Sequence, residues 1–162
     1  MRFRLANAED YPAGLNLPWT APLEAWPDVR CTDVERGLHR NPVRFVAHDG
    51  AIYAIKELLE RVAEREYALL RSLQELSLPV VEPVGLVTDR PAAPGDERRG
   101  LLVTRFLQHS MPFRNVISRG VSASQAFQLL DALADLLVNL HLAGFFWGDC
   151  SLSNALFRLD AG

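Results

Sequence analysis

The chain has 162 residues, 49% of them apolar, and a mean hydropathy close to zero, as expected of one globular domain rather than a disordered chain. The formal net charge of −3 gives no basic excess, which argues against binding nucleic acid or an anionic membrane through charge. The N-terminus lacks the apolar stretch of a secretory signal, and the most apolar region, 127–146, is interrupted by Asp131, Asp135 and Asn139. We therefore expect a cytoplasmic protein without a transmembrane segment.

Residues 1–40 are irregular. They contain four prolines and two tryptophans, Trp19 and Trp26, and show neither a helical nor a strand periodicity. We interpret this region as an N-terminal arm that packs on a domain through its tryptophans.

A β-hairpin is predicted next. Two β-type runs, 43–46 and 52–55, are separated by Asp49-Gly50, a strong signal for a two-residue turn. The second strand ends at Lys56, the one lysine among 17 basic residues. Lysine is a compact point charge that arginine does not replace freely, so Lys56 is the first candidate for chemistry.

Residues 57–76 are predicted to form a helix that follows the hairpin directly. At 100° per residue, one face carries several apolar side chains, and Glu66 lies between Leu70 and Leu73 on that face, whereas Glu64 points to water. The apolar positions are Leu59, Val62, Leu69, Leu70, Leu73 and Leu76. An inward carboxylate needs a partner, and Lys56 is the nearest candidate. This pair indicates either a nucleotide site or a plain ion pair between strand and helix.

The second half of the chain predicts two strands and a long helix. The strands are 84–87 and 101–107, and they flank a polar loop at 91–100. The helix spans 122–143, opens with a Ser122-x-x-Gln125 capping box and closes at Gly144. Its predicted apolar side consists of Ala126, Leu129, Leu130, Leu133, Leu136, Leu137 and Leu140.

A short loop after this helix carries Asp149 and Asn154, followed by a strand-like run at 155–159. Asp-x4-Asn is the spacing of a kinase catalytic loop, in which the aspartate accepts the proton of the attacking hydroxyl and the asparagine binds magnesium. The elements that precede it also occur in the kinase order. We therefore expect an α+β, protein-kinase-like fold with an arm (1–40), a small sheet-plus-helix N-lobe (41–107) and the beginning of a helical C-lobe (108–162).

Several segments resemble one family. They are Leu17-Pro18-Trp19, Val43-Arg44-Phe45-Val46, Tyr53-Ala54-Ile55-Lys56-Glu57, Glu64-Arg65-Glu66-Tyr67, Pro83-Val84-Gly85, Leu140-His141-Leu142-Ala143-Gly144-Phe145 and 147–154. On these segments, residues from about 14 to 162 resemble an uncharacterised bacterial family of kinase-like proteins, often labelled lipopolysaccharide kinase, within the protein-kinase-like superfamily.

The resemblance implies roles for particular residues. Lys56 would hold the α- and β-phosphates of ATP and Glu66 would brace it, while Thr104 and Phe106 would lie in the adenine-side hinge, which spans 104–107.

In the loop, the resemblance makes Asp149 the catalytic base and Asn154 a ligand of Mg²⁺. The Gly148-Asp149 pairing resembles small-molecule and sugar kinases, so the expected acceptor is a non-protein hydroxyl, such as one on a sugar or a lipid-linked group.

A kinase also needs a second metal-binding aspartate. Asp160 follows Asn154 by six residues, and an extended strand would carry it about 20 Å away, so we expect this aspartate beyond residue 162. On this interpretation the chain is a fragment that does not turn over alone, and it is an ATP-dependent transferase if the chain continues. The alternative is a pseudokinase, a nucleotide-binding scaffold or an interaction module without catalysis. It is indicated by Trp147 and by the single glycine in 35–41, where kinases have a glycine-rich loop.

Overall fold

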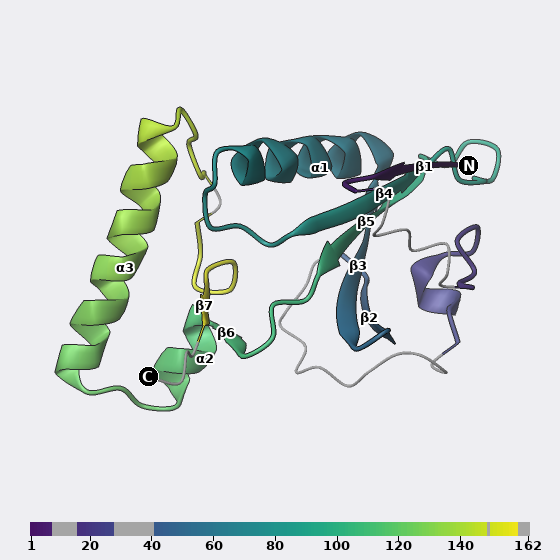
Figure 1. The fold of residues 1–162 in the computed structure, drawn as a ribbon. Coiled ribbons are helices and arrows are strands. Elements are labelled where there is room, and N and C mark those ends of the chain that lie inside the picture. The colour runs from purple at the N-terminus through teal and green to yellow at the C-terminus, as the bar shows by residue number, and fades with distance from the viewer. Residues whose placement is uncertain (8–15, 28–40, 149, 159–162) are drawn as a thin grey trace. The chain divides into compact units, whose positions relative to one another are not determined.

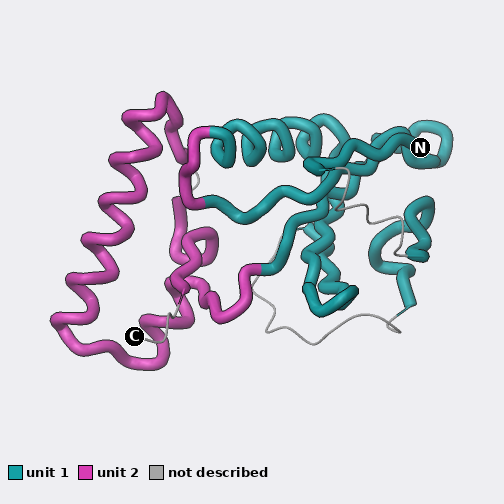
Figure 2. Tube along the Cα trace, viewed as in Figure 1, with its two compact units in different colours: residues 1–75, 80–106 teal, residues 76–79, 107–162 magenta. Residues whose placement is uncertain are grey.

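The computed structural model of the protein describes residues 1–7, 16–27, 41–148 and 150–158. The chain forms two compact units, one made of Met1–Glu75 with Val80–Phe106 and the other of Leu76–Pro79 with Leu107–Gly162 (Figure 2). Each unit is described by itself below.

The first unit is built on a five-stranded antiparallel sheet in the order β1-β4-β5-β3-β2 (Figure 1). The strands are β1 (Arg2–Leu5), β2 (Val43–His48), β3 (Ala51–Leu59), β4 (Pro83–Thr88) and β5 (Arg99–Arg105). Strand β3 lies between β2 and β5, so the lysine it carries is inside the sheet rather than at an edge.

The predicted hairpin is confirmed in β2 and β3. Its turn residues Asp49 and Gly50 have φ of 47° and 75°, and a type I′ turn requires positive φ at both central positions. The turn fixes a register in which Phe45 faces Ala54 and Val43 faces Lys56.

Helix α1 (Glu60–Glu75) packs on one face of the sheet. Its Ala63 and Tyr67 form a buried cluster with three strand residues, Leu58, Leu86 and Leu102. Burial also raises the pKa of the Tyr67 phenol, although the nearby charges of Arg71 and Arg4 oppose the shift.

The predicted start of this helix at residue 57 is wrong, because β3 continues to Leu59. The last three residues of β3 pair with β5, where Glu57 faces Leu101, Leu58 faces Gly100 and Leu59 faces Arg99. The local helical pattern is overridden by these pairings, which link residues distant in sequence.

The predicted apolar face of the helix is confirmed at Leu73, which is buried, and at Leu70, which packs on this cluster, but the face is shifted around the helix axis from the predicted one. Val62 and Leu69 are 41% and 42% exposed, whereas Ala63 and Tyr67 are buried. The reason lies across the interface at Gly100, where an added Cβ would stand 3.1 Å from the Ala63 Cβ. The helix approaches the sheet through two small residues, which a count of large apolar side chains does not include.

The opposite face of the sheet is covered by residues 17–26, which we call the strap. The strap includes a short 3₁₀ helix, η3 (Leu23–Ala25). Trp19, Leu23 and Trp26 are buried in a cluster with residues of β2, β3, β4 and β5. The sheet residues of this cluster are Val46, Ile55, Val84, Val87, Leu101 and Val103. The predicted packing of both tryptophans is thus confirmed, whereas the strand β1 in the same N-terminal region was not expected.

The second unit contains two helices and a two-stranded sheet. They are β6 (Ser110–Pro112), α2 (Phe113–Ser118), α3 (Ala123–Leu142) and β7 (Leu156–Arg158), and β6 pairs antiparallel with β7. In α3 the capping box of Ser122 and Gln125 is present, and Gly144 follows the helix with φ of 83°, as predicted.

The predicted apolar side of α3 is largely confirmed. Leu140 is buried and most other positions on this side are half-buried, but Leu130 is 53% exposed. In the part of the chain that the structure describes, α3 and the other helices are too short or too polar to cross a membrane.

The strap should contribute to stability as a part of the core. Leu23→Ala is expected to lower the free energy of unfolding by about 2–5 kcal/mol, because Leu23 is 0% exposed and its removal leaves a cavity. Leu69→Ala, on the exposed side of α1, should cost less than about 1 kcal/mol. Urea denaturation of both variants measures the difference, and equal costs would show that the strap is not part of the core.

Candidate functional site

Lys56 and Glu66 form an ion pair between β3 and α1. The Lys56 ammonium donates to the two carboxylate oxygens of Glu66 at 2.9 and 3.1 Å. The predicted pairing of these side chains is therefore confirmed. The side chains are 35% and 33% exposed, so the pair is held in place and is still accessible to a ligand from solvent.

Glu64 is the acid predicted to point to water. It is 48% exposed and accepts a hydrogen bond from Arg4 of β1 at 2.5 Å. The two acids of α1 therefore differ in their partners: Glu66 binds the lysine of β3, and Glu64 binds an arginine at the edge of the sheet.

Lys56 shares its face of the sheet with two rows of side chains. Residues paired across antiparallel strands project to the same side. One row is Val43, Lys56 and Leu102, and the next is Phe45, Ala54 and Thr104. The register thus places Thr104, a predicted nucleotide-binding residue, on the lysine's face and one row away.

Phe106 closes this face next to the second row. Its backbone N–H donates to Ile52 at 2.8 Å, and its ring meets Phe45 edge-on with centroids 5.5 Å apart. Phe45 itself is 9% exposed. Phe106 and the second row thus place apolar and aromatic groups beside the Lys56 ammonium, a combination suited to a ligand with a flat ring and an anionic group.

Phe45 was not among the predicted site residues. A signal for it exists in the sequence, because counting back from the Asp49-Gly50 turn pairs Phe45 with Ala54, two residues before Lys56. Strand alternation alone therefore places Phe45 on the lysine's side.

In the second unit, Asn154 lies in a turn that α2 holds in place. Its backbone N–H donates to Ser151 at 3.0 Å, and the first N–H groups of α2, from Phe113 and Arg114, donate to Ala155 and Leu152 at 2.9 and 2.8 Å. These contacts fix the backbone on both sides of Asn154.

The other half of the predicted loop motif, Asp149, lies outside the described residues, as does Asp160. Within the described residues, no cluster of three or more His, Cys, Asp or Glu side chains could hold a metal. Magnesium often takes only one or two protein ligands together with substrate phosphates, and an asparagine oxygen is one of the ligands it accepts. Asn154 is thus compatible with a magnesium site that is completed by a nucleotide.

Comparisons with known proteins point to one family. The model of the "Lipopolysaccharide kinase (Kdo/WaaP) family" matches residues 38–162. A solved structure, "WaaP in complex with acyl carrier protein", aligns with 100% of this chain and 66% of that chain at a TM-score of 0.62 and 21% sequence identity. This likeness confirms the predicted kinase-like α+β fold, and the chain spans about two thirds of that solved protein. A search of curated proteins found no match.

The Lys56–Glu66 contact should be measurable as a coupling energy. In a double-mutant cycle of Lys56→Met and Glu66→Gln, we expect a coupling of about 0.5–1 kcal/mol in the free energy of unfolding, because both side chains are partly exposed to solvent. The matched cycle at Arg4 and Glu64, which are 45% and 48% exposed, should give a smaller coupling. A Lys56–Glu66 coupling of zero would contradict the contact.

Proposed function

Because the chain belongs to the Kdo/WaaP lipopolysaccharide kinase family, we propose that it is a phosphotransferase that moves the γ-phosphoryl group of ATP to a hydroxyl acceptor. One observation carries the proposal: the single lysine of the chain is paired with Glu66 at 2.9 Å, beside an aromatic surface. A structural ion pair alone would not require this surface next to it.

For the nucleotide, Lys56 supplies the positive charge for the α- and β-phosphates, and Glu66 keeps the flexible lysine stem in place. The Glu66 carboxylate accepts two hydrogen bonds from an ammonium that has three donors, so a further donor is available to a phosphate oxygen. Phe45, Ala54 and Thr104, with Phe106 beside them, provide the surface for the base.

For the reaction, we propose that Asp149 accepts the proton of the acceptor hydroxyl and that Asn154 is a ligand of Mg²⁺. Support comes from the Asp-x4-Asn spacing and from the backbone contacts that hold Asn154. When bound, Mg-ATP supplies the phosphoryl group and the charge neutralisation of its phosphates. This chain's residues bind the nucleotide, orient it and remove the proton.

The acceptor class follows from the family and from the loop. The family description names lipopolysaccharide, a glycolipid with many sugar hydroxyl groups, and Gly148 rather than arginine precedes Asp149 in the loop. We propose a sugar or lipid-linked hydroxyl as the acceptor and the cytoplasm, which supplies ATP, as the location of the reaction.

The first test is nucleotide binding. Mg-ATP should raise the melting temperature of the protein, and at 100 times the dissociation constant the stabilisation should reach about 2.7 kcal/mol. Lys56→Met should remove most of the shift, and Lys56→Arg should not restore it, because a guanidinium fork does not replace a point charge. A melting temperature that Mg-ATP leaves unchanged would contradict the proposal.

Turnover separates the kinase from its alternative. In a protein that continues past residue 162 and includes the expected second metal-binding aspartate, the γ-phosphoryl group of ATP should be transferred to purified lipopolysaccharide but not to a generic protein substrate. In that protein, Asp149→Asn should reduce the rate by at least about 100-fold without weakening ATP binding. Binding of ATP without transfer to any acceptor would instead identify a nucleotide-binding module without catalysis.

A further inference from the structure

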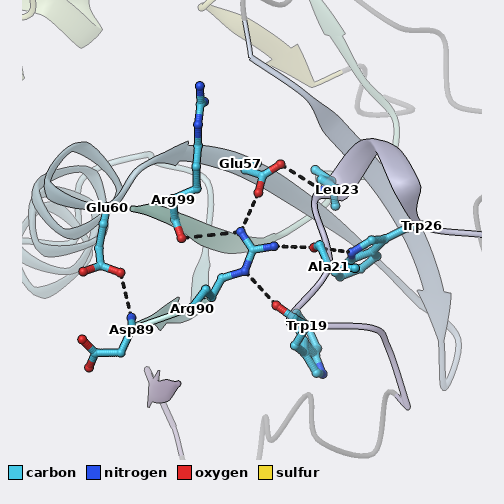
Figure 3. Close-up of polar contacts among 9 residues, drawn as sticks. All are labelled: Trp19, Ala21, Leu23, Trp26, Glu57, Glu60, Asp89, Arg90 and Arg99. Carbon is cyan, nitrogen blue, oxygen red and sulfur yellow. Dashed lines mark hydrogen bonds and ion pairs between the residues drawn. The ribbon is translucent and has the colours of Figure 1, made fainter. Parts of the chain in front are cut away.

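A second ion pair, between Arg90 and Glu57, is buried on the face of the sheet opposite Lys56 and has no assigned role. Arg90 lies two residues after the end of β4. Its guanidinium donates to the Glu57 carboxylate at 2.5 Å, to the Trp19 carbonyl at 2.7 Å and to the Ala21 carbonyl (Figure 3). The two charged side chains are only 4% and 8% exposed. Such a pair is stable only while its hydrogen-bond partners stay in place, because an unpaired buried charge is costly.

Glu57 is held at both carboxylate oxygens. One accepts from Arg90, and the other accepts from the Leu23 backbone N–H at 2.9 Å (Figure 3). Glu57 is the next residue after Lys56 in β3, and neighbours in a strand project to opposite faces. The contacts of Glu57 therefore fix the position of the backbone that carries Lys56.

The segment that supplies Arg90 also holds the start of α1. We call residues 89–98 the tether loop. The Asp89 N–H donates to the Glu60 carboxylate at 2.7 Å, and the Glu60 N–H donates to the Arg98 carbonyl at 2.9 Å. One loop is thus bonded to β3 just after Lys56 and to the first residue of the helix that carries Glu66.

We propose that Glu57 and Arg90 are positioning residues for the nucleotide lysine. Since the tether loop binds both β3 and α1, it sets the distance between the strand that carries Lys56 and the helix that carries Glu66. The strap joins the same network through Trp19, Ala21 and Leu23, so its docking on one face of the sheet supports the ion pair on the other. The importance of this role for catalysis rests on the proposed function.

The competing explanation is that the buried pair only fastens the strap. The two explanations differ at Lys56, because a fastener can weaken without any effect on the far face of the sheet. Lys56 is the one lysine of the chain, so an amine-selective ester modifies only Lys56 and the N-terminal amine. Mass spectrometry of the proteolytic peptides gives the acylation rate of Lys56 separately from that of the N-terminal amine. Free Nα-acetyl-lysine in the same solution is the reference.

Glu57→Gln keeps the shape of the side chain and removes its charge. We expect it to increase the acylation rate of Lys56 about threefold, because the amine must leave its contact with Glu66 to react. Glu66→Gln, which removes that contact directly, should give at least the same increase. The matched control is Arg98→Met: Arg98 is in the tether loop but is 62% exposed and pairs with Asp89 at the surface, so the rate should not change.

A second variant separates the loss of the strap contacts from the effect of leaving one buried charge unpaired. In Glu57→Leu/Arg90→Met, an apolar pair replaces both buried charges, so that neither charge is left without its partner. The acylation rate should still be raised, because the apolar pair makes no hydrogen bonds to the strap. Wild-type rates in folded Glu57→Gln and in the folded double variant would overturn the proposal.

The acylation measurement is made without nucleotide. A change at Lys56 therefore supports the positioning role even if the protein does not bind ATP. Conversely, an unchanged rate together with normal ATP binding would reject the positioning role and leave the proposed function standing.

Discussion

Two adjacent charges on one interior strand constrain the first unit. Lys56 and Glu57 leave β3 on opposite faces, and each is paired: Lys56 with Glu66 of α1, and Glu57 with the buried Arg90. Because β3 lies between β2 and β5, both charges project from an interior strand, where each face of the sheet needs a cover. Helix α1 covers one face and the strap covers the other. The Glu57–Arg90 pair connects β3 to the strap.

This arrangement puts most of the apolar core on one face of the sheet and the lysine on the other. The strap packs Trp19, Leu23 and Trp26 on one face of the sheet. Without this cover the face would be exposed to water, as one face of an antiparallel sheet often is. The opposite face is left to α1 and to the surface formed by Phe45, Thr104 and Phe106. The apolar core is therefore concentrated on the strap side, and the lysine's side keeps room for a partly exposed cation.

The parts of the fold that the sequence predicted are those with local signals. The hairpin turn requires positive φ at two adjacent positions, and Asp49-Gly50 accommodates it. The Ser122 capping box joins residues three apart, so neither feature depends on distant contacts. The Lys56–Glu66 pair was found because a carboxylate between apolar helix positions needs a cation. The phase of that helix was misjudged because it approaches the sheet where Ala63 meets Gly100, and these two residues carry almost no side chain. Strand β1 and the Glu57–Arg90 pair depend on partners roughly 30 to 90 residues away, which no local pattern reveals.

The central claim is that the face carrying Lys56 binds the phosphates of a nucleotide. Protection of this one lysine from an amine-selective ester tests the claim directly, because the acylation rate reports on the accessibility of the Lys56 amine itself rather than on overall stability. The account predicts that Mg-ATP slows acylation of Lys56 in proportion to site occupancy, that adenosine without phosphates protects far less, and that the N-terminal amine is unaffected. Modification of Lys56 at the same rate with and without saturating Mg-ATP would contradict it.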